Sequence, residues 1–281
     1  MSKHKQRLIS INGKPLEAKK PGIMMGRPIS RNPMWENQLK FQEAFLTLSH
    51  EGYRMYGEDM ESIRWWLNHH SAARNNIAKT FLDRPDCDYL VWIDDDTTFD
   101  NLAEDIKKMI ALDKDMVMAI TSCKPVPHFP NVGKFTEIGK SGTIVDSVSR
   151  HIYEFPLDEP FESDFGSFGL VCVKRKVFEA MKPPWFYFPP NEINNGVWGE
   201  DVTFCFNAKM HGFELWIDPT IKLGHLGYMS VHHTLRASHY TDFKAVLIKE
   251  AKEVGWDYTH KLVPEVQAIF KSAPGIKRMY V

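Results

Sequence analysis

The chain alternates short apolar runs with longer segments in which apolar residues recur at helical spacing. The runs at 89–93 and 116–121 hold aliphatic, aromatic and β-branched residues with no regular polar alternation, as in strands buried on both faces of a parallel sheet. Residues 35–48, 71–82 and 102–112 place apolar side chains every three or four positions, which is the period of an α-helix. This β-α alternation predicts an α/β fold with a Rossmann-like, mostly parallel sheet flanked by helices.

Later segments follow this pattern less regularly. Prolines and glycines interrupt residues 123–165, which predicts hairpins and loops over the sheet edge, and a strand is expected to resume at 166–174. A further helix is predicted to begin at Glu200, because apolar side chains again recur at helical spacing and a glycine follows at the far end. Two short strands, 214–217 and 221–223, are expected next, separated by an Asp-Pro turn.

Local charge and pattern divide the chain into three parts. Residues 1–21 carry six Lys or Arg side chains against one Glu, which predicts a basic N-terminal arm. Residues 22–230 form the predicted α/β domain. Residues 231–281 are predicted to form a C-terminal helical extension that packs on this domain.

The overall composition excludes several classes of protein. With 281 residues, 43% of them hydrophobic and 25% charged, the chain is long enough for one large α/β domain. Its formal net charge of -1 excludes binding to nucleic acid or to an anionic membrane through the charge of the whole chain. Four scattered cysteines without a Cys-x-x-Cys pair predict neither disulfides nor a zinc site. No segment approaches the roughly 20 apolar residues of a membrane span, so we expect a soluble protein of the cytoplasm, the host's cytoplasm if the chain is viral.

Three consecutive carboxylates, Asp94, Asp95 and Asp96, end the apolar run at 89–93. They are therefore expected at the carboxyl end of a strand, where open α/β sheets bind their ligands. If the strand continues through them, Asp94 and Asp96 project together and Asp95 faces away. Paired carboxylates repel unless a cation intervenes, and such oxygen ligands suit Mg²⁺ or Mn²⁺ bound jointly with substrate phosphates. The alternative is a solvated turn that caps the next helix.

Two arginines lie where they can reach a nucleotide. Arg27 belongs to residues 26–33, which are predicted to form the loop after a first strand at 22–25, although a plain surface turn explains this stretch equally well. Arg74 lies off the apolar stripe near the start of the helix at 71–82, where it can hold a phosphate or a base edge. Its alternative is a solvated position on the helix surface.

A second group of polar residues follows more than 100 positions later. Glu200 and Asp201 are expected in the first turn of a helix, where free amides and the helix dipole already explain one carboxylate. His225 lies in a glycine-rich stretch that leaves it room to reach a site as a ligand. The alternative role is that of a buried structural histidine.

In order and spacing, these stretches resemble a GT-A-fold glycosyltransferase of the family 2 type. The three aspartates resemble the family's Asp-x-Asp motif, Gly199-Glu200-Asp201-Val202 its acceptor-side Glu-Asp motif, and Gly224-His225 its late metal-binding histidine. Ala73-Arg74-Asn75 resembles a further element before the Asp-x-Asp strand. The resemblance covers roughly residues 22–227 and departs from the family at 166–169, where relatives often have Gly-x-Gly. The lack of an apolar span suits a soluble member of the phage or viral type.

The resemblance implies a nucleotide-diphosphate sugar as donor, with a UDP-hexose expected. Asp96 and His225 would hold Mn²⁺ or Mg²⁺, and Asp94 would bind ribose or sugar hydroxyls. Asp201 would be the general base of an inverting reaction, with Glu200 as its substitute, and its place at a helix N-terminus is expected to lower its pKa. The remaining expected contacts of the nucleotide-sugar are Arg27, Arg74 and Asp95.

The acceptor and the reaction class leave alternatives open. A glycan, a protein or a hydroxymethylated DNA base can serve as acceptor, and the aromatic run at 185–188 either stacks such a base or belongs to the core. The alternative functions are a nucleotidyltransferase-like enzyme and a non-catalytic nucleotide-sugar-binding protein. No glycine-rich phosphate loop with a lysine follows the first strand, which disfavours the nucleotidyltransferase.

Overall fold

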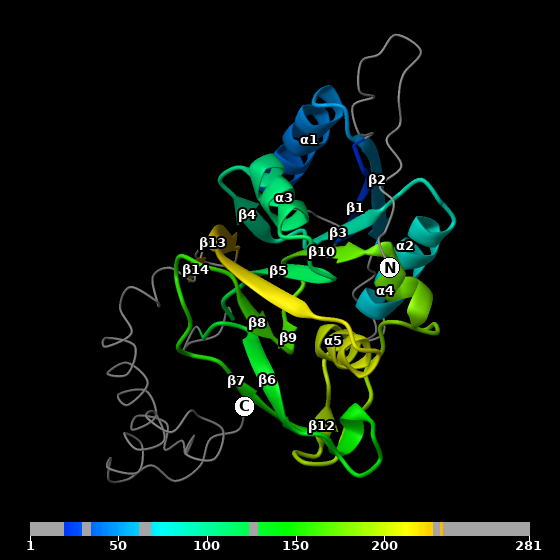
Figure 1. The fold of residues 1–281 in the computed structure, drawn as a ribbon, viewed down its shortest axis with the longest axis vertical. Helices are drawn as coiled ribbons and strands as arrows, with labels where there is room; N and C mark the ends of the chain where they lie inside the picture. The colour runs from blue at the N-terminus through cyan, green and yellow to red at the C-terminus, as the bar shows by residue number, and fades with distance from the viewer. Residues whose placement is uncertain (1–19, 30–34, 62–68, 124–128, 227–230, 233–281) are drawn as a thin grey trace, which may run out of the picture.

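The computed structural model describes residues 20–29, 35–61, 69–123, 129–226 and 231–232. In them a nine-stranded sheet runs through the centre, and helices cover both of its faces (Figure 1). Its main path, in spatial order, is β14 (Val231–His232), β13 (Leu215–His225), β5 (Met116–Ile120), β10 (Leu170–Lys174), β3 (Tyr89–Ile93), β1 (Gly22–Ile29) and β2 (Arg54–Glu61). The remaining two strands, β4 (Thr97–Phe99) and β8 (Phe161–Ser163), pair with β13.

The central strands run largely in one direction. β1 is parallel to β2 and β3, and β13 is parallel to β5. β10 lies between β3 and β5 and is antiparallel to both, so that only β10 opposes the other central strands. The predicted α/β class, with a largely parallel central sheet, is confirmed.

Helices on each face pack against alternate residues of the strands. α1 (Trp35–His50) and α3 (Leu102–Ala111) cover one face, and α2 (His69–Leu82), α4 (Arg175–Ala180) and α5 (Glu200–Met210) cover the other. In β3, Val91 and Ile93 pack with the first pair of helices, whereas Leu90 and Trp92 pack with the second group. All four side chains are fully buried, and each stabilises the fold by about 2 kcal/mol relative to exposure.

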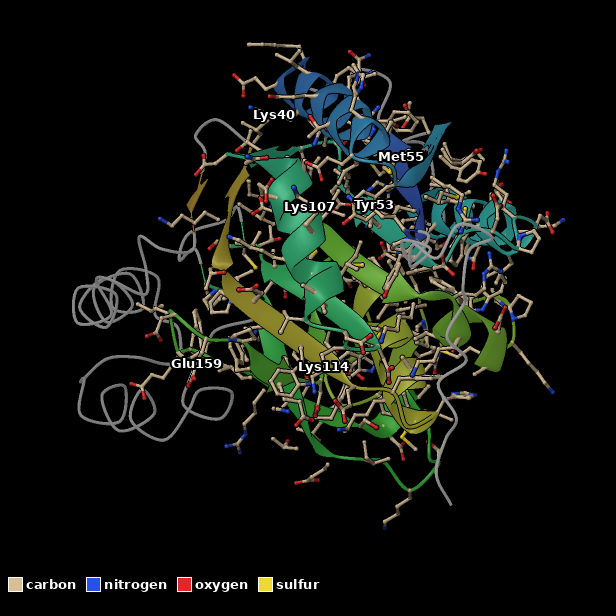
Figure 2. All side chains as sticks on the ribbon, turned by 45° about the horizontal axis from the view of Figure 1, so that its top comes forward. Lys40, Tyr53, Met55, Lys107, Lys114 and Glu159 are labelled. Carbon is tan, nitrogen blue, oxygen red and sulfur yellow. The ribbon has the colours of Figure 1, made fainter. Side chains whose placement is uncertain are left out.

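Charged groups join α1 and α3 on their shared face. Lys107 of α3 lies at this surface (Figure 2), and its Nζ donates to Glu51 Oε1 at 2.9 Å, just beyond the end of α1. At the start of α3, Asn101 accepts a hydrogen bond from the backbone N–H of Glu104 at 3.3 Å and caps the helix. α1 and α3 are therefore joined into one layer on this face of the sheet, next to the ends of β1 and β3.

Two smaller sheets are drawn below the main sheet in Figure 1. The first comes mainly from residues 123–165, which prolines and glycines interrupt. Hairpins were predicted for this stretch, and they are confirmed in its described residues. A three-stranded antiparallel sheet is formed by β7 (Val148–His151), β6 (Val132–Glu137) and β9 (Phe165–Gly166), with a short 3₁₀ helix, η1 (Ile144–Asp146), beside it. A separate hairpin of β11 (Pro190–Asn191) and β12 (Gly196–Val197) leads into α5.

Two predicted boundaries are wrong. Residues 26–29 continue β1 and do not begin a loop, because the buried charge of Arg27 meets Asp59 at the paired position of β2. The two strands expected at 214–217 and 221–223 are one strand, β13, in which a register shift between Asp218 and Lys222 absorbs the Asp-Pro sequence.

Several predicted parts lie outside the described residues. They include the end of the predicted loop at 30–33, most of the basic arm and nearly all of the C-terminal extension, of which only β14 is described. Among the helices that are described, none has the length and apolar content needed to cross a membrane.

Candidate functional site

The three aspartates form a turn at the carboxyl end of β3. The backbone N–H of Thr97 donates to Asp94 O at 3.3 Å, and Thr97 Oγ1 donates to the same carbonyl at 2.6 Å. Residues 94–97, here called the carboxylate turn, reverse the chain into β4. The condition under which Asp94 and Asp96 would project together from a continued strand is therefore not met. The side chains of Asp94 and Asp96 are 26% and 34% exposed, whereas Asp95 is only 9% exposed as a whole residue.

Asn37 of α1 supports the carboxylate turn from behind. Its Nδ2 donates to Asp94 O and to Thr97 O, both at 2.8 Å, and the residue is fully buried. Its Oδ1 in turn accepts a hydrogen bond from Arg27 Nη1 at 3.1 Å. A buried amide between two backbone carbonyls and a guanidinium fixes the position of the turn.

Arg27 is fully buried, and its hydrogen bonds go to protein groups. Its Nε and Nη2 donate to the two carboxylate oxygens of Asp59 at 2.9 and 2.6 Å, and Nη2 also donates to Gln38 Oε1 at 2.6 Å. Arg27 therefore braces the carboxylate turn through Asn37. Its predicted contact with the nucleotide-sugar stays a prediction.

Arg74 of α2 lies between the two predicted groups of carboxylates. Its Nη2 donates to Asp94 Oδ1 at 2.7 Å, and its Nε lies 3.5 Å from Glu200 Oε1. The residue is 2% exposed, and its guanidinium lies over the ring of Phe168 at 4.9 Å from the centroid. The solvated alternative for Arg74 is therefore wrong, and this side chain brings the end of β3 and the start of α5 together.

Glu200 and Asp201 occupy the first turn of α5, as predicted. Gly199 at the N-cap offers no side chain for the free amides, and Asp201 Oδ1 accepts a hydrogen bond from the backbone N–H of Val202 at 2.8 Å. Burial raises the pKa of Asp201 to about 7, and the neighbouring Glu200 adds to this shift. The predicted lowering of this pKa is wrong, because burial and a like charge outweigh the helix terminus and the guanidinium of Arg74.

The same buried charges act on Asp94 and Arg74. Burial raises the pKa of Asp94, with Arg74 acting to lower it and the charge of Asp96 raising it further. Burial acts to lower the pKa of Arg74, but Asp94, Glu200 and Asp201 outweigh this and hold it above its ordinary value. The charge of one guanidinium thus acts together with those of three carboxylates.

His225 ends β13 beside the carboxylate turn. β13 pairs with β4 so that His225 lies opposite Thr97, and the N–H of Leu226 donates to Asp96 O at 2.7 Å. His225 Nδ1 donates to the carbonyl of Ser122 at 2.8 Å. Since that carbonyl can only accept, Nδ1 carries a proton, and the other ring nitrogen, Nε2, lies 3.5 Å from Asp96 Oδ1. The predicted pair of Asp96 and His225 therefore lies together.

This pair fits a divalent cation that is shared with a phosphorylated substrate. No group of three or more His, Cys, Asp or Glu side chains that could hold a metal ion occurs in the described part of the chain. Mg²⁺ needs only one or two protein carboxylates when substrate phosphates and waters complete its shell, and an imidazole nitrogen beside a carboxylate also suits Mn²⁺. One oxygen and one oriented nitrogen meet this requirement.

Asn75 follows Arg74 in the Ala73-Arg74-Asn75 stretch, and no role is expected for it from the sequence. Its Oδ1 accepts the backbone N–H groups of Trp185 at 2.8 Å and Phe186 at 3.1 Å, and its Nδ2 donates to Phe186 O at 2.7 Å. Phe186 is buried and stacks on Phe204 with centroids 4.6 Å apart. Trp185 and Phe186 are therefore core residues, as the second alternative for this aromatic run proposed. The feature of the sequence that could have pointed to Asn75 is its position next to Arg74, off the apolar stripe of the helix.

Gly169 closes the other side of the carboxylate turn. Its carbonyl accepts from the N–H of Asp94 and from Thr97 Oγ1, both at 3.2 Å. A Cβ at this position would lie 2.4 Å from Thr121 Oγ1 and 3.0 Å from Thr97 Cγ2. A glycine is thus required at the end of residues 166–169, because the backbone just before β10 approaches both Thr121 and the carboxylate turn closely.

No protein-family model matches this chain, and no curated protein matches it. Among solved structures, A197 from STIV is similar at 16% identity and a TM-score of 0.46, over 74% of this chain and 86% of that chain. A glycosyltransferase involved in the glycosylation of the major capsid of PBCV-1 is similar at 14% identity and a TM-score of 0.29, over 61% and 72% of the two chains. S. aureus TarS 1-349 is similar at 13% identity and a TM-score of 0.34, over 90% and 71%. All three TM-scores are below 0.5, so none of these similarities supports the function proposed below.

Proposed function

We propose that this chain is a metal-dependent glycosyltransferase that moves a sugar from a nucleotide-diphosphate sugar, with a UDP-hexose as the expected donor, to an acceptor hydroxyl with inversion. One observation carries the proposal: Arg74 joins Asp94 to Glu200, while His225 faces Asp96 on the other side of the same turn. A His–Asp pair that suits a cation and the first turn of α5, where the pKa of Asp201 is raised, thus lie on two sides of one strand end. This is where α/β folds bind nucleotides.

The donor half of the site centres on Asp96 and His225. These two residues would hold Mn²⁺ or Mg²⁺, which when bound supplies Lewis-acid neutralisation of the diphosphate leaving group. The hydrogen bond from Nδ1 to Ser122 keeps Nε2 of His225 directed at the site. One carboxylate oxygen of Asp94 accepts the hydrogen bond from Arg74. We assign the other oxygen to ribose or sugar hydroxyls.

Asp95 belongs to the predicted donor contacts together with Arg27 and Arg74. Asp95 is largely buried in the carboxylate turn. We retain it among the donor contacts as a proposal.

The acceptor half centres on Asp201. In the proposed step, the acceptor oxygen forms a bond to the anomeric carbon, its proton passes to the Asp201 carboxylate, and the nucleoside diphosphate leaves with the bonding electron pair. A carboxyl group whose pKa is about 7 is half ionised at neutral pH and is a stronger base than an ordinary aspartate. Glu200 is paired with Arg74, so we assign the proton transfer to Asp201 and keep Glu200 as its substitute.

A test of the reaction class measures UDP release from a panel of UDP-hexoses by the full chain, with Mn²⁺ or Mg²⁺ and then with EDTA. We expect hydrolysis or transfer with metal and none with EDTA, and Asp96→Asn should abolish it. Asp100→Asn is the matched control, since this aspartate is exposed and lies outside the predicted site. Equal turnover in EDTA would refute the metal role.

The same preparation separates the alternative functions. A nucleotidyltransferase-like enzyme would release pyrophosphate from a nucleoside triphosphate instead, and a non-catalytic protein would bind UDP-hexose with metal and never turn it over. The predicted acceptors are a glycan, a protein or a hydroxymethylated DNA base. Transfer to a glycan panel, to denatured protein and to hydroxymethylated DNA, measured side by side, identifies which class accepts the sugar.

A further inference from the structure

The guanidinium of Arg74 has one partner in each half of the site. Nη2 donates to Asp94 Oδ1 at 2.7 Å, and Nε faces Glu200 Oε1 at 3.5 Å. The two carboxylates belong to segments more than 100 residues apart in sequence, the carboxylate turn and the first turn of α5. A planar fork with donors on both edges can hold two carboxylates at a fixed separation, which a single ammonium cannot do.

The surroundings of Arg74 leave little access for a phosphate. Its Nε and Nη1 are buried and make no hydrogen bond to any described group. The rings of Trp92, Phe168 and Phe186 lie 4.9 to 5.9 Å from the guanidinium carbon. Because Arg74 is only 2% exposed, a donor diphosphate could reach this side chain only if neighbouring groups moved, which disfavours the direct phosphate contact expected from the sequence.

We propose that Arg74 is a positioning residue that ties the donor-side carboxylate Asp94 to the acceptor-side pair Glu200 and Asp201, and thereby sets both the place and the charge of the catalytic base. The inference rests on the glycosyltransferase function proposed above and deepens it. Arg74 contacts neither substrate in this scheme; it acts on the reaction through Asp94 and Glu200.

The charges around Asp201 give Arg74 a second effect. The groups that face this carboxyl are Glu200 and Cys205 on α5, Asp94 after β3 and Arg74 on α2. Among these, Arg74 is the positive charge, and it lowers the pKa of Asp201 against the effects of burial, Glu200 and Asp94. Removal of the guanidinium should therefore raise the pH at which Asp201 becomes an effective base.

The test compares Arg74→Met, which keeps an unbranched stem against the rings, with Lys79→Met, which removes an exposed charge from the same helix. For Arg74→Met we expect the ascending limb of the kcat/KM profile to move up by at least about half a pH unit. Affinity for UDP-hexose with Mn²⁺ should change less than about threefold. Lys79→Met should behave as the wild type.

Arg74→Lys is the second variant and remains informative if Arg74→Met does not fold. It keeps the positive charge, so the limb should stay close to that of the wild type, while kcat falls because one ammonium cannot contact both carboxylates. A wild-type kcat in Arg74→Lys would overturn the bridging role. For Arg74→Met, an ascending limb at the wild-type pH with the same fractional loss of rate at every pH would mean that Arg74 acts through packing alone. A tenfold or larger loss of UDP-hexose affinity would mean that Arg74 binds the donor directly.

A readout without turnover separates this inference from the proposed function. The titration of the Asp201 carboxyl can be followed by NMR in protein labelled with ¹³C at its aspartate carboxyl carbons, with Asp201→Asn to assign the signal. An upward shift of that titration in Arg74→Met supports the role of Arg74 even if no sugar transfer is found. The same titration in both proteins would overturn it even if transfer is found.

Discussion

Replacement of Asp201 by Asn should raise stability and strongly reduce transfer in the same molecule. Burial and Glu200 raise the pKa of this carboxyl from 3.8 to about 7 in the folded chain. Because the folded pKa lies above the unfolded one, the folded state binds the extra proton between about pH 4 and pH 7. The contribution of Asp201 to stability is therefore full below about pH 4, and it is lost as the pH rises to 7.

The size of this effect follows from the shift. One pKa unit corresponds to about 1.4 kcal/mol, so a shift of roughly three units sets an upper limit of about 4 kcal/mol. Asp201 is partly exposed and titrates together with Glu200, so the stability lost when Asp201 ionises is expected to be about 1–3 kcal/mol. Asn does not ionise, and its side-chain oxygen can still accept the hydrogen bond from the N–H of Val202.

The assay measures thermal unfolding of wild type and Asp201→Asn from pH 4 to pH 8, with transfer rate and UDP-hexose affinity on the same preparations. The difference in Tm should be small near pH 4, grow up to pH 7 and stay constant above it, at about 2–4 °C per kcal/mol for a domain of this size. Transfer should fall by about 10²-fold or more while donor affinity stays nearly unchanged.

Two results would refute this reasoning. A Tm difference that does not vary with pH would mean that Asp201 has an ordinary pKa. Near-wild-type turnover would remove Asp201 from the mechanism and leave Glu200 as the candidate base. Glu200→Gln is the comparison variant, because it also removes a carboxylate from the first turn of α5 but breaks the ion pair with Arg74.

Three further substitutions test other residues of the proposed site. His225→Ala should raise the Mn²⁺ concentration needed for half-maximal activity by roughly 10- to 100-fold, and an unchanged metal requirement would make this histidine structural. Gly169→Ala should lower stability by about 1–3 kcal/mol and reduce transfer, because its Cβ would lie 2.4 Å from Thr121 Oγ1. Gly57→Ala is the matched control, because a Cβ there would make only ordinary contacts of 3.6 Å or more. Asn37→Ala leaves two backbone carbonyls and Arg27 Nη1 without this partner, so unfolding by urea should show a loss of about 2 kcal/mol or more. Wild-type stability in this variant would mean that water replaces the amide.

The sequence predicted the parts of the site that depend on local pattern. The strand at 89–93 and the start of α5 at Glu200 are both found where periodicity placed them. The apolar run is uniform, and the helix has a glycine at each end, so the local pattern leaves few alternatives. The meeting of Asp96 and His225 was also predicted, although from the order of motifs and not from any local signal.

The turn at the three aspartates could not be predicted in the same way. A continued strand and a turn are both compatible with three carboxylates followed by Thr97. The choice depends on partners far away in sequence, since Asn37 and Gly169 supply the hydrogen bonds that hold residues 94–97. The same holds for Arg27, which lies in a Gly-Arg-Pro sequence typical of a loop but is kept in β1 by Asp59 on the next strand.

The raised pKa of Asp201 shows why the chemistry of the site is harder to predict than its location. A helix N-terminus favours the ionised carboxylate, and that contribution can be anticipated from sequence. Burial and the charge of Glu200 act in the opposite direction, and their size depends on how closely the end of β3 approaches α5. Arg74 contacts both segments, and we propose that it helps to set this approach. The strength of the base is therefore a property of the tertiary contact between the two motifs, and neither motif carries it alone.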